Sequence, residues 1–350
     1  MDTKYGVMGY ASHNIGDEIQ TLAQMRFIPR VDYLCVRESL SKFKSLKNEK
    51  VKLIMNAWYM WRPQYFPPSE DIIPLPISMH FAERKCPQSF FEVPDVKAWL
   101  KDHGPIGTRD MYTCHRLHAA GIEAYFSGCM TLTLLPNKSI KKKYKNTKYV
   151  LAVDLNKSEL DTLKSRTDIP VYSINKMFYG SSNANRLELA RCVLSLYHNA
   201  HVVVSRNLHT AMPTLAMQTP TLLISSDKDA SFIARTSGML HFVHNITSKE
   251  FINNSKLYDI DNPPKNPDYY KEVAKNLTSA CTEFTGFDSK ESPLLDDFNP
   301  TFALVNLLQH DSEQIERTLY YANEEQLLQA LYDVRLKKQN KYSIATRDSL

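Results

Sequence analysis

Short apolar segments alternate with amphipathic stretches along most of this 350-residue chain, and this alternation limits the folds that it can adopt. In the first half, strand-like segments cover 5–10, 31–36, 51–56, 104–109 and 122–126, and helical patterns cover 17–27 and 110–120. In the second half, strand-like segments cover 149–154, 170–174, 202–205 and 221–225, and helical patterns cover 186–198, 208–217 and 229–236. Strands that alternate with helices in this way are typical of parallel sheets with crossover helices. The sequence therefore predicts an α/β fold.

A lysine-rich segment separates the two halves, with six lysines in residues 138–148. Such a segment is typical of a solvated linker, and steering of anions is the alternative interpretation. We therefore predict an N-terminal Rossmann-like domain over 1–137 and a C-terminal one over 149–288, which face each other across a cleft. Residues 289–350 are expected to form a linker and a helical tail, whose apolar face either packs back onto the body or forms a homo-oligomer.

The composition favours some classes of partner over others. The net charge is only +5, which fits an anionic small molecule or transient contact with acidic membranes better than nucleic acid. The six cysteines lack the spacing of zinc ligands and are expected to be buried thiols in a reducing compartment. No signal-like stretch opens the sequence and no run reaches the roughly 20 apolar residues of a membrane span. We expect a soluble, cytoplasmic protein with no metal and no cofactor.

Polar residues gather at four predicted turns between a strand and the helix after it. In open α/β sheets ligands bind beyond the carboxyl ends of the strands, where helix N-termini present free N–H groups. The four turns hold, in chain order, His13, Asn14, Gly16 and Asp17; Thr108, Arg109 and Asp110; Ser205, Arg206, Asn207 and His209; and Ser225, Ser226, Asp227 and Lys228.

Each of these residues also has an ordinary structural interpretation. Asp17 is a candidate helix cap, Arg109 and Asp110 a candidate ion pair, His209 a candidate core histidine and Lys228 a candidate surface lysine. Together, however, cations and a histidine at the rims of two facing domains suit an anion that carries a phosphate, with the histidine as proton donor or acceptor.

An aromatic segment at 56–66 holds Trp58 and Trp61 directly after a predicted strand, with Asn, Arg and Gln nearby. Aromatic faces beside polar groups suit a sugar, which is apolar on its C–H face and polar at its rim. The alternative is packing of the same aromatic residues in the core, and His80 has the same two interpretations.

The order of three motifs resembles the polysaccharide pyruvyl transferase family. The motifs are Asn14-Ile15-Gly16-Asp17, Thr108-Arg109-Asp110 with Gly121 after it, and Val204-Ser205-Arg206-Asn207-Leu208-His209 followed by Pro220 and Lys228. The resemblance covers residues 5–285. It implies a two-domain fold of the glycosyltransferase B type and transfer of the enolpyruvyl unit of phosphoenolpyruvate onto two sugar hydroxyls, which forms a cyclic ketal and releases phosphate.

The resemblance also implies roles for the polar residues. His209 is the expected acid or base, and Asp17 is expected to face the cleft or to hold the first loop. The C-terminal domain is the expected donor side, and the donor-binding residues are Arg109, Arg206, Asn207, Ser205 and Lys228. The N-terminal domain is the expected acceptor side, where the chemistry of the residues themselves, rather than the resemblance, suggests Asn14, Trp58, Trp61 and His80 as saccharide-binding residues.

Two departures from the family pattern keep alternatives open. The family usually has an arginine two residues before the histidine, where this chain has Asn207, and a shift to Arg206 rotates the side chain by about 100° at a helix start. Ser127-Gly128-Cys129 also stands where many relatives carry an acidic residue. A glycosyltransferase with a nucleotide-sugar donor, or a non-catalytic saccharide-binding protein, is compatible with the same fold.

Overall fold

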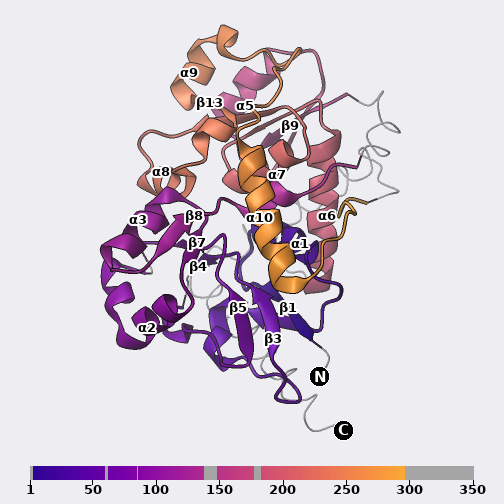
Figure 1. The fold of residues 1–350 in the computed structure, drawn as a ribbon. Coiled ribbons are helices and arrows are strands. Elements are labelled where there is room, and N and C mark those ends of the chain that lie inside the picture. Colours follow the sequence, from indigo (N-terminus) through magenta and orange to yellow (C-terminus); the bar gives the residue numbers. More distant parts are fainter. Residues whose placement is uncertain (1–2, 60–61, 85, 138–147, 177–182, 296–350) are drawn as a thin grey trace, which may run out of the picture.

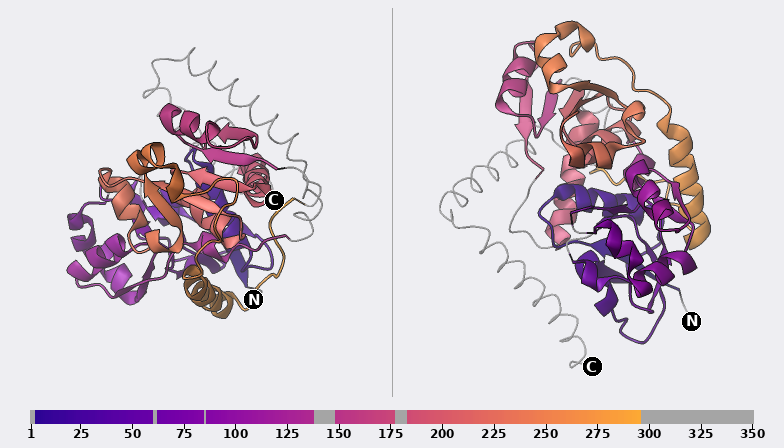
Figure 2. Two further views of the ribbon diagram at one scale, coloured as in Figure 1. Left: turned by 90° about the horizontal axis from the view of Figure 1, so that it is seen from above. Right: turned by 90° about the vertical axis from the view of Figure 1, so that its left-hand side faces the viewer.

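The computed structural model of the chain describes residues 3–59, 62–84, 86–137, 148–176 and 183–295. Within these residues the chain forms two α/β halves, one built on each of two parallel sheets. Figures 1 and 2 show the sheet of the N-terminal half and the sheet of the C-terminal half at opposite ends of the molecule. The predicted α/β fold class is therefore confirmed.

The N-terminal half contains a four-stranded parallel sheet with the order β2-β1-β3-β5. Its strands are β1 (Lys4–Gly9), β2 (Tyr33–Val36), β3 (Val51–Ile54) and β5 (Ile72–Leu75). The same half contains two separate two-stranded parallel sheets, namely β4 (Trp58–Tyr59) with β6 (His80–Phe81), and β7 (Ile106–Thr108) with β8 (Ala124–Phe126). The helices are α1 (Ile15–Met25), α2 (Pro94–Asp102) and α3 (Met111–Ala119).

The C-terminal half contains a five-stranded parallel sheet with the order β10-β9-β11-β12-β13. Its strands are β9 (Val150–Val153), β10 (Val171–Ile174), β11 (Val202–Ser205), β12 (Thr221–Ser225) and β13 (His244–Thr247). Its helices are α5 (Lys157–Lys164), α6 (Asn183–Asn199), α7 (Leu208–Ala216), α8 (Ala230–Thr236) and α9 (Ser248–Asn253). All residues of β9 and β11 are buried, as expected for strands covered on both faces.

Short 3₁₀ helices connect several of these elements, at Arg37–Lys42, Pro63–Tyr65, Gln88–Glu92, Met130–Thr133, Leu240–Phe242 and Ser255–Leu257. The last helix described, α10 (Tyr270–Thr285), runs from the C-terminal half back along the N-terminal half (Figure 1). Lys52 Nζ donates to the carbonyl of Phe284 at 2.6 Å, and the Tyr5 hydroxyl to that of Thr285 at 3.3 Å. The helix ends at Gly286, whose φ of 75° is left-handed, as is common after a helix.

Helix α1 belongs by sequence to the N-terminal half but packs into the core of the C-terminal half. Ile15, Ile19 and Leu22 share one buried cluster with residues of α6 such as Val193 and Leu194. A buried ion pair also joins these two helices, because Arg186 contacts both carboxylate oxygens of Glu18, at 2.5 and 2.7 Å. The two halves are therefore joined through a continuous apolar core.

Most predicted elements agree with the structure within two or three residues, and the start of the first helix shows why a boundary moves. The helix begins at Ile15 rather than Asp17, because the Asn14 side chain accepts from the backbone N–H of Gly16 at 3.0 Å and caps it. The predicted lysine-rich linker falls almost wholly on 138–147, and the predicted tail helices and their self-association on 296–350; both lie outside the described residues. Residues 289–295 are described, and Leu294 among them is buried in the shared core.

All six cysteines are free thiols, and five of them are buried, as the sequence predicts. In the parts of the chain that are described, no helix has both the length and the apolar character needed to cross a membrane.

Candidate active site

His209 lies where the sheet of the C-terminal half meets the first loop of the N-terminal half. It follows β11 and is the second residue of α7, so it sits at the carboxyl end of the sheet, where ligands bind in open α/β folds. A Cβ atom at Gly16 would lie 2.8 Å from the Cβ of His209 and 2.9 Å from its Nδ1. Only glycine therefore allows the start of α1 to approach the imidazole this closely.

Arg109 contacts the other edge of the imidazole. It follows β7, is only 1% exposed, and its Nη1 lies 3.2 Å from Nε2 of His209. Because a guanidinium can only donate, this contact requires a lone pair on Nε2 and places the imidazole proton on Nδ1. Burial lowers the pKa of His209 well below its usual value, and the charges of Arg109, Arg235 and Lys176 lower it further. At neutral pH the imidazole is therefore an uncharged base.

The guanidinium of Arg109 also has donors without an acceptor. Its Nε and Nη2 are buried and form no hydrogen bond with any described residue, although Nε lies 3.6 Å from Oδ2 of Asp110. A buried donor without a partner costs about 1–3 kcal/mol, so such donors are expected to bind an anion or water at this site.

Two further cations face His209, and neither was predicted from the sequence. Lys176 comes two residues after β10, and Arg235 lies in the last turn of α8. Burial lowers the pKa of both side chains, the charge of Arg109 adds to the effect on Arg235, and the charge of Arg235 adds to the effect on Lys176. Three cations thus compete for the same space, which favours a ligand with at least two negative charges.

Lys176 is held in place by Asn207 and Asp154. Its ammonium group donates to Oδ1 of Asn207 and lies 3.5 Å from Oδ2 of Asp154, while Nδ2 of Asn207 donates to the same carboxylate. The backbone N–H of Asn207 donates to the buried Ser205 hydroxyl at 2.9 Å. The first loop joins this network, because the N–H of Ile15 donates to the carbonyl of Lys176 at 3.0 Å. Asn207 therefore orients a cation of the site.

Arg206 points in another direction. Its Nη1 lies 3.7 Å from Oε2 of the buried Glu159, which caps α5, and its side chain is 40% exposed. The structure gives Arg206 no contact with His209 or Arg109. Lys228 is exposed on the loop between β12 and α8, and its backbone N–H donates to the Ser226 hydroxyl at 3.4 Å, whereas its ammonium group has no hydrogen bond with any residue that the structure describes.

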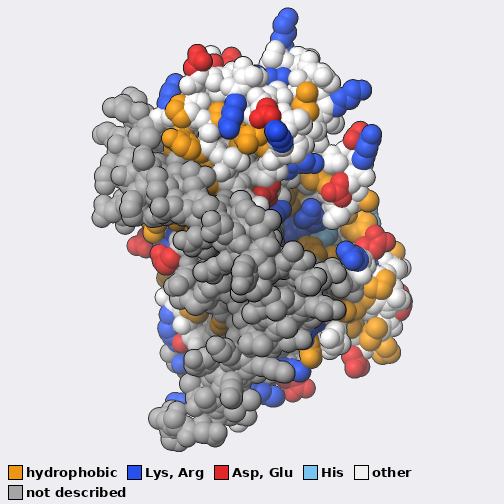
Figure 3. Space-filling view, turned by 180° about the vertical axis from the view of Figure 1, so that it is seen from behind, with side chains coloured by type: hydrophobic (Ala, Val, Ile, Leu, Met, Phe, Trp, Pro, Cys, Tyr) orange, Lys and Arg blue, Asp and Glu red, His pale blue; other side chains and the backbone are white. Residues whose placement is uncertain are grey.

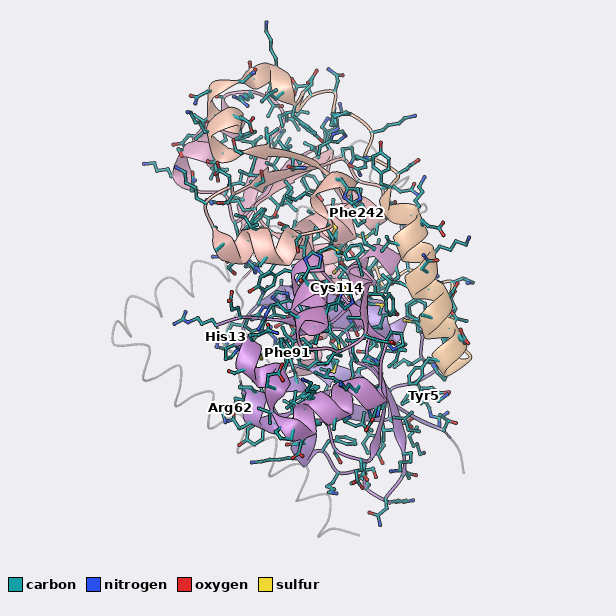
Figure 4. All side chains as sticks on the ribbon, turned by 60° about the vertical axis from the view of Figure 1, so that its left-hand side comes forward. Tyr5, His13, Arg62, Phe91, Cys114 and Phe242 are labelled. Atoms are coloured by element: carbon teal, nitrogen blue, oxygen red, sulfur yellow. The ribbon has the colours of Figure 1, made fainter. Side chains whose placement is uncertain are left out.

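Asp17 is buried in the first loop. Its carboxylate accepts from the Ser12 hydroxyl and from Gln20 at 3.4 Å, and it lies 3.4 Å from Nη1 of Arg37. Arg37 is itself buried and pairs with Glu38. These contacts hold the loop that carries Gly16 against His209. His13, in the same loop, lies close to where the two halves meet (Figure 4).

The predicted acceptor residues lie in different surroundings. Asn14 caps α1, and Trp58 is half-buried with the guanidinium of Arg37 5.6 Å from its ring centre. His80 is buried, and its Nδ1 lies 2.6 Å from Oδ2 of Asp110. Trp61 lies outside the described residues.

A hollow between the two halves is visible from the side opposite to Figure 1, and Lys, Arg and His side chains line it (Figure 3). No group of three or more His, Cys, Asp or Glu side chains in the described part of the chain could hold a metal ion.

Of the predicted residues, the structure brings Arg109, Asn207 and His209 into one cluster. Lys176 and Arg235 complete it, and no local signal identifies them, because a lysine just after a strand and an arginine in a last helical turn are common surface features.

The sequence model of one protein family, described as polysaccharide pyruvyl transferase, matches residues 14–228, more than half of the chain. No curated protein matches the sequence significantly. Among solved structures, two of the wall teichoic acid polymerase TagF are similar to 90% and 91% of this chain and to 89% and 90% of their own, at 11% identity and TM-scores of 0.35 and 0.34. A structure of E. coli heptosyltransferase WaaC with ADP is similar over 78% of this chain and 99% of its own, at 12% identity and a TM-score of 0.26.

Proposed function

This chain belongs to the polysaccharide pyruvyl transferase family, and on that premise we propose that it transfers a pyruvyl group from phosphoenolpyruvate to a saccharide in glycan biosynthesis. The family match supports a transferase that acts on polysaccharides. The donor is inferred from the cluster around His209, which combines an uncharged imidazole with three cations.

The observation that carries the proposal is the buried guanidinium of Arg109. It donates to His209 and retains buried donors on Nε and Nη2 that no described residue accepts. A planar guanidinium binds phosphate or carboxylate through two parallel hydrogen bonds. An oxyanion bound there would lie next to the imidazole, so the donor's reacting carbons would lie within reach of a proton acceptor.

Phosphoenolpyruvate carries a phosphate and a carboxylate on adjacent carbons of one small molecule. We assign Arg109 to one of these groups and Lys176 and Arg235 to the other. Asn207 has a positioning role, since its Oδ1 accepts from the Lys176 ammonium group and its Nδ2 donates to Asp154. Lys228 is exposed at the rim, where it would attract the donor rather than enclose it.

The reaction requires two proton transfers. The first hydroxyl of the saccharide adds to the enol double bond, so that its oxygen bonds to C2 and a proton reaches the methylene C3, which becomes a methyl group. The second hydroxyl then bonds to C2 as the bond from C2 to the phosphate oxygen breaks, and its proton leaves with the phosphate. We propose that His209 takes the first hydroxyl's proton and delivers a proton to C3.

The remaining residues are proposed either to hold the first loop in place or to bind the saccharide. Asp17 has the role of holding the first loop, given its contacts with Ser12 and Arg37. Asn14 and Trp58 are proposed to face the saccharide, and so is His80. The cytoplasmic location expected from the sequence stays a prediction.

Calorimetry with phosphoenolpyruvate tests the donor directly. We expect saturable binding that Arg109→Lys weakens, because lysine cannot form the bidentate pair, by the ~1.5–3 kcal/mol typical of hydrogen bonds to charged groups. Arg116→Lys is the matched control, since Arg116 is also buried but donates to the carbonyls of Phe81 and Cys86. No heat with phosphoenolpyruvate would reject the proposed donor.

Calorimetry also distinguishes the proposed activity from the alternative, a glycosyltransferase with a nucleotide-sugar donor. A nucleotide-sugar enzyme would bind uridine and cytidine diphosphates more tightly than phosphoenolpyruvate, because it needs a pocket for the base. Binding of phosphoenolpyruvate with no competition from these nucleotides would exclude it.

A further inference from the structure

A second histidine, paired with a carboxylate, lies on the N-terminal side of the cluster. His80 is 2% exposed, and its Nδ1 lies 2.6 Å from Oδ2 of Asp110 and 3.2 Å from the Thr113 hydroxyl. The other carboxylate oxygen of Asp110 accepts from the backbone N–H of Thr113 at 2.9 Å and caps α3. Helix α3 thus fixes the carboxylate, and the carboxylate fixes the ring.

This pairing determines which nitrogen of His80 is basic. Burial opposes ionisation of Asp110, but the hydrogen bonds from His80 and from the backbone N–H of Thr113, together with the charge of Arg109, outweigh it and lower its pKa, so Asp110 is a carboxylate at neutral pH. A carboxylate only accepts hydrogen bonds, so Nδ1 carries the imidazole proton and Nε2 carries the lone pair. Nε2 forms no hydrogen bond with any described residue.

His80 lies between the proposed saccharide-binding residue Trp58 and the proposed donor-binding cluster around His209. It is paired in register with Trp58 across the parallel β4–β6 pair, so the two side chains lie on the same face of that pair. Asp110 Oδ2 also lies 3.6 Å from Nε of Arg109, whose Nη1 contacts His209. His80, Asp110, Arg109 and His209 therefore form one chain of contacts from the aromatic residue to the donor cluster.

We propose that His80, oriented by Asp110, accepts the proton of the second saccharide hydroxyl, while His209 serves the first. This inference rests on the proposed ketal transfer, which must deprotonate two hydroxyls at different stages. In the second stage the O–H bond breaks and its proton moves to Nε2, the oxygen bonds to C2, and the electron pair of the breaking bond leaves with the phosphate. The phosphate then takes the proton back from His80, and the ring regains its uncharged form.

An acceptor with one hydroxyl removed separates the two histidines. Methyl glucopyranoside offers O4 and O6 for a cyclic ketal, whereas its 4-deoxy analogue offers O6 alone at that position and allows only the first addition. With the diol, we expect His80→Asn to slow phosphate release by about 10²–10⁴-fold, the usual contribution of one acid–base group. With saturating deoxy sugar in D₂O, the maximal rate of deuterium incorporation at C3 should change by less than about threefold in the same variant, because His209 is intact and a weaker contact with the sugar would raise only KM.

The controls distinguish a proton acceptor from a structural residue. His209→Asn should slow both reactions, and His115→Asn, an exposed histidine on α3, should slow neither. Equal losses in both reactions for His80→Asn, with weakened phosphoenolpyruvate binding, would mean that His80 only supports Arg109 and would overturn the proposal. Full activity of His80→Asn with the diol would overturn it as well.

Nitrogen chemical shifts test the pair without turnover. We expect wild-type His80 to be protonated at Nδ1 and unprotonated at Nε2 at pH 7, and Asp110→Asn, which keeps a capping oxygen, to change this preference. Protonation at Nε2 in the wild type would overturn the proposal whatever the activity. Absence of phosphate release and of phosphoenolpyruvate binding in the wild type would instead reject the proposed function, and the dyad would then be judged from these shifts alone.

Discussion

His209 is surrounded by positive charge, and no carboxylate of the described residues lies against it. Arg109 lies 3.2 Å from its Nε2, and Lys176 and Arg235 also lower its pKa. An anionic donor would reverse this balance, because negative charge next to an imidazole favours the protonated form. Donor binding would thus turn a weak base into a group able to hold and return a proton.

Replacement of His209 tests this role. We expect His209→Asn to lower kcat by about 10²–10⁴-fold, because the amide cannot carry a proton, and to leave phosphoenolpyruvate affinity nearly unchanged. His118→Asn, an exposed histidine that contacts the carbonyl of Ala124, is the control. Turnover within about threefold of wild type in a folded His209→Asn protein would contradict the assignment.

The lowered pKa of His80 makes the free energy of unfolding depend on pH. Burial lowers its pKa from 6.5 to about 4, with the charges of Arg109 and Arg235 adding to the effect. Below pH 6.5 the unfolded chain binds a proton that the folded protein does not, so this residue destabilises the fold progressively as the pH falls toward 4. The cost reaches about 3 kcal/mol, and His80→Asn should remove that part of the slope in urea unfolding followed from pH 7 to 4.5. An unchanged slope in the variant would show that His80 titrates normally.

The turn between β11 and α7 decides which side chain faces the donor. Asn207 holds Lys176, whereas Arg206 contacts Glu159 of α5. Asn207→Ala should therefore weaken phosphoenolpyruvate binding by about 1–3 kcal/mol, because it leaves Lys176 and Asp154 without their shared partner. Arg206→Ala should change donor affinity little and stability by less than about 1 kcal/mol, as expected of a partly exposed ion pair. Calorimetry and urea unfolding of both variants measure the two effects, and a larger loss of affinity in Arg206→Ala would reverse the assignment.

The alternation of apolar and amphipathic segments was sufficient to predict the strands and helices. It did not determine the residue at which each helix starts, and so not the direction in which the side chains at a helix start point. The run at 202–205 has one interpretation, because three consecutive valines and a serine leave no polar face, and the structure places β11 at the predicted residues with all four buried. The direction of Arg206 depends instead on the residue at which α7 starts and on the capping Glu159, which is 47 positions away in sequence and carries no local signal. Arg235 and Lys176 were missed for the same reason, since both reach His209 only through the fold. The pairing of His80 with Asp110 likewise joins residues 30 positions apart.

At the scale of the whole molecule, the residues after α10 are part of the folded body. The N–H of Ser289 donates to the carbonyl of Arg26 at 2.8 Å, the Ser292 hydroxyl to that of Leu135 at 2.8 Å, and Leu294 is buried in the shared core. The sequence alone placed the body's end at residue 288, whereas these contacts extend to residue 295.

Two truncations test where the body ends. The free energy of unfolding of a protein of residues 1–295 should exceed that of residues 1–288 by roughly 2–4 kcal/mol, because Leu294 is buried and hydrogen bonds form around it. Both should bind phosphoenolpyruvate, because the cluster around His209 lies elsewhere. Loss of donor binding in the protein of residues 1–295 would show that the site needs residues after 295. Equal free energies of unfolding for the two truncations would show that Leu294 does not stabilise the fold.

The placement of α1 also has a consequence for how the protein is made. Glu18 meets Arg186 only after another 168 residues have followed it, and Ile19 and Leu22 are buried against that same helix. At the usual 5–20 residues per second, the ribosome needs roughly 10–30 s to add them. During this interval the nascent N-terminal half carries an apolar helix without its partner, which is a surface that chaperones recognise. Folding of the first half is therefore completed by the second, and synonymous codon changes that slow synthesis between residues 25 and 186 should lengthen exposure of this helix and lower the soluble yield.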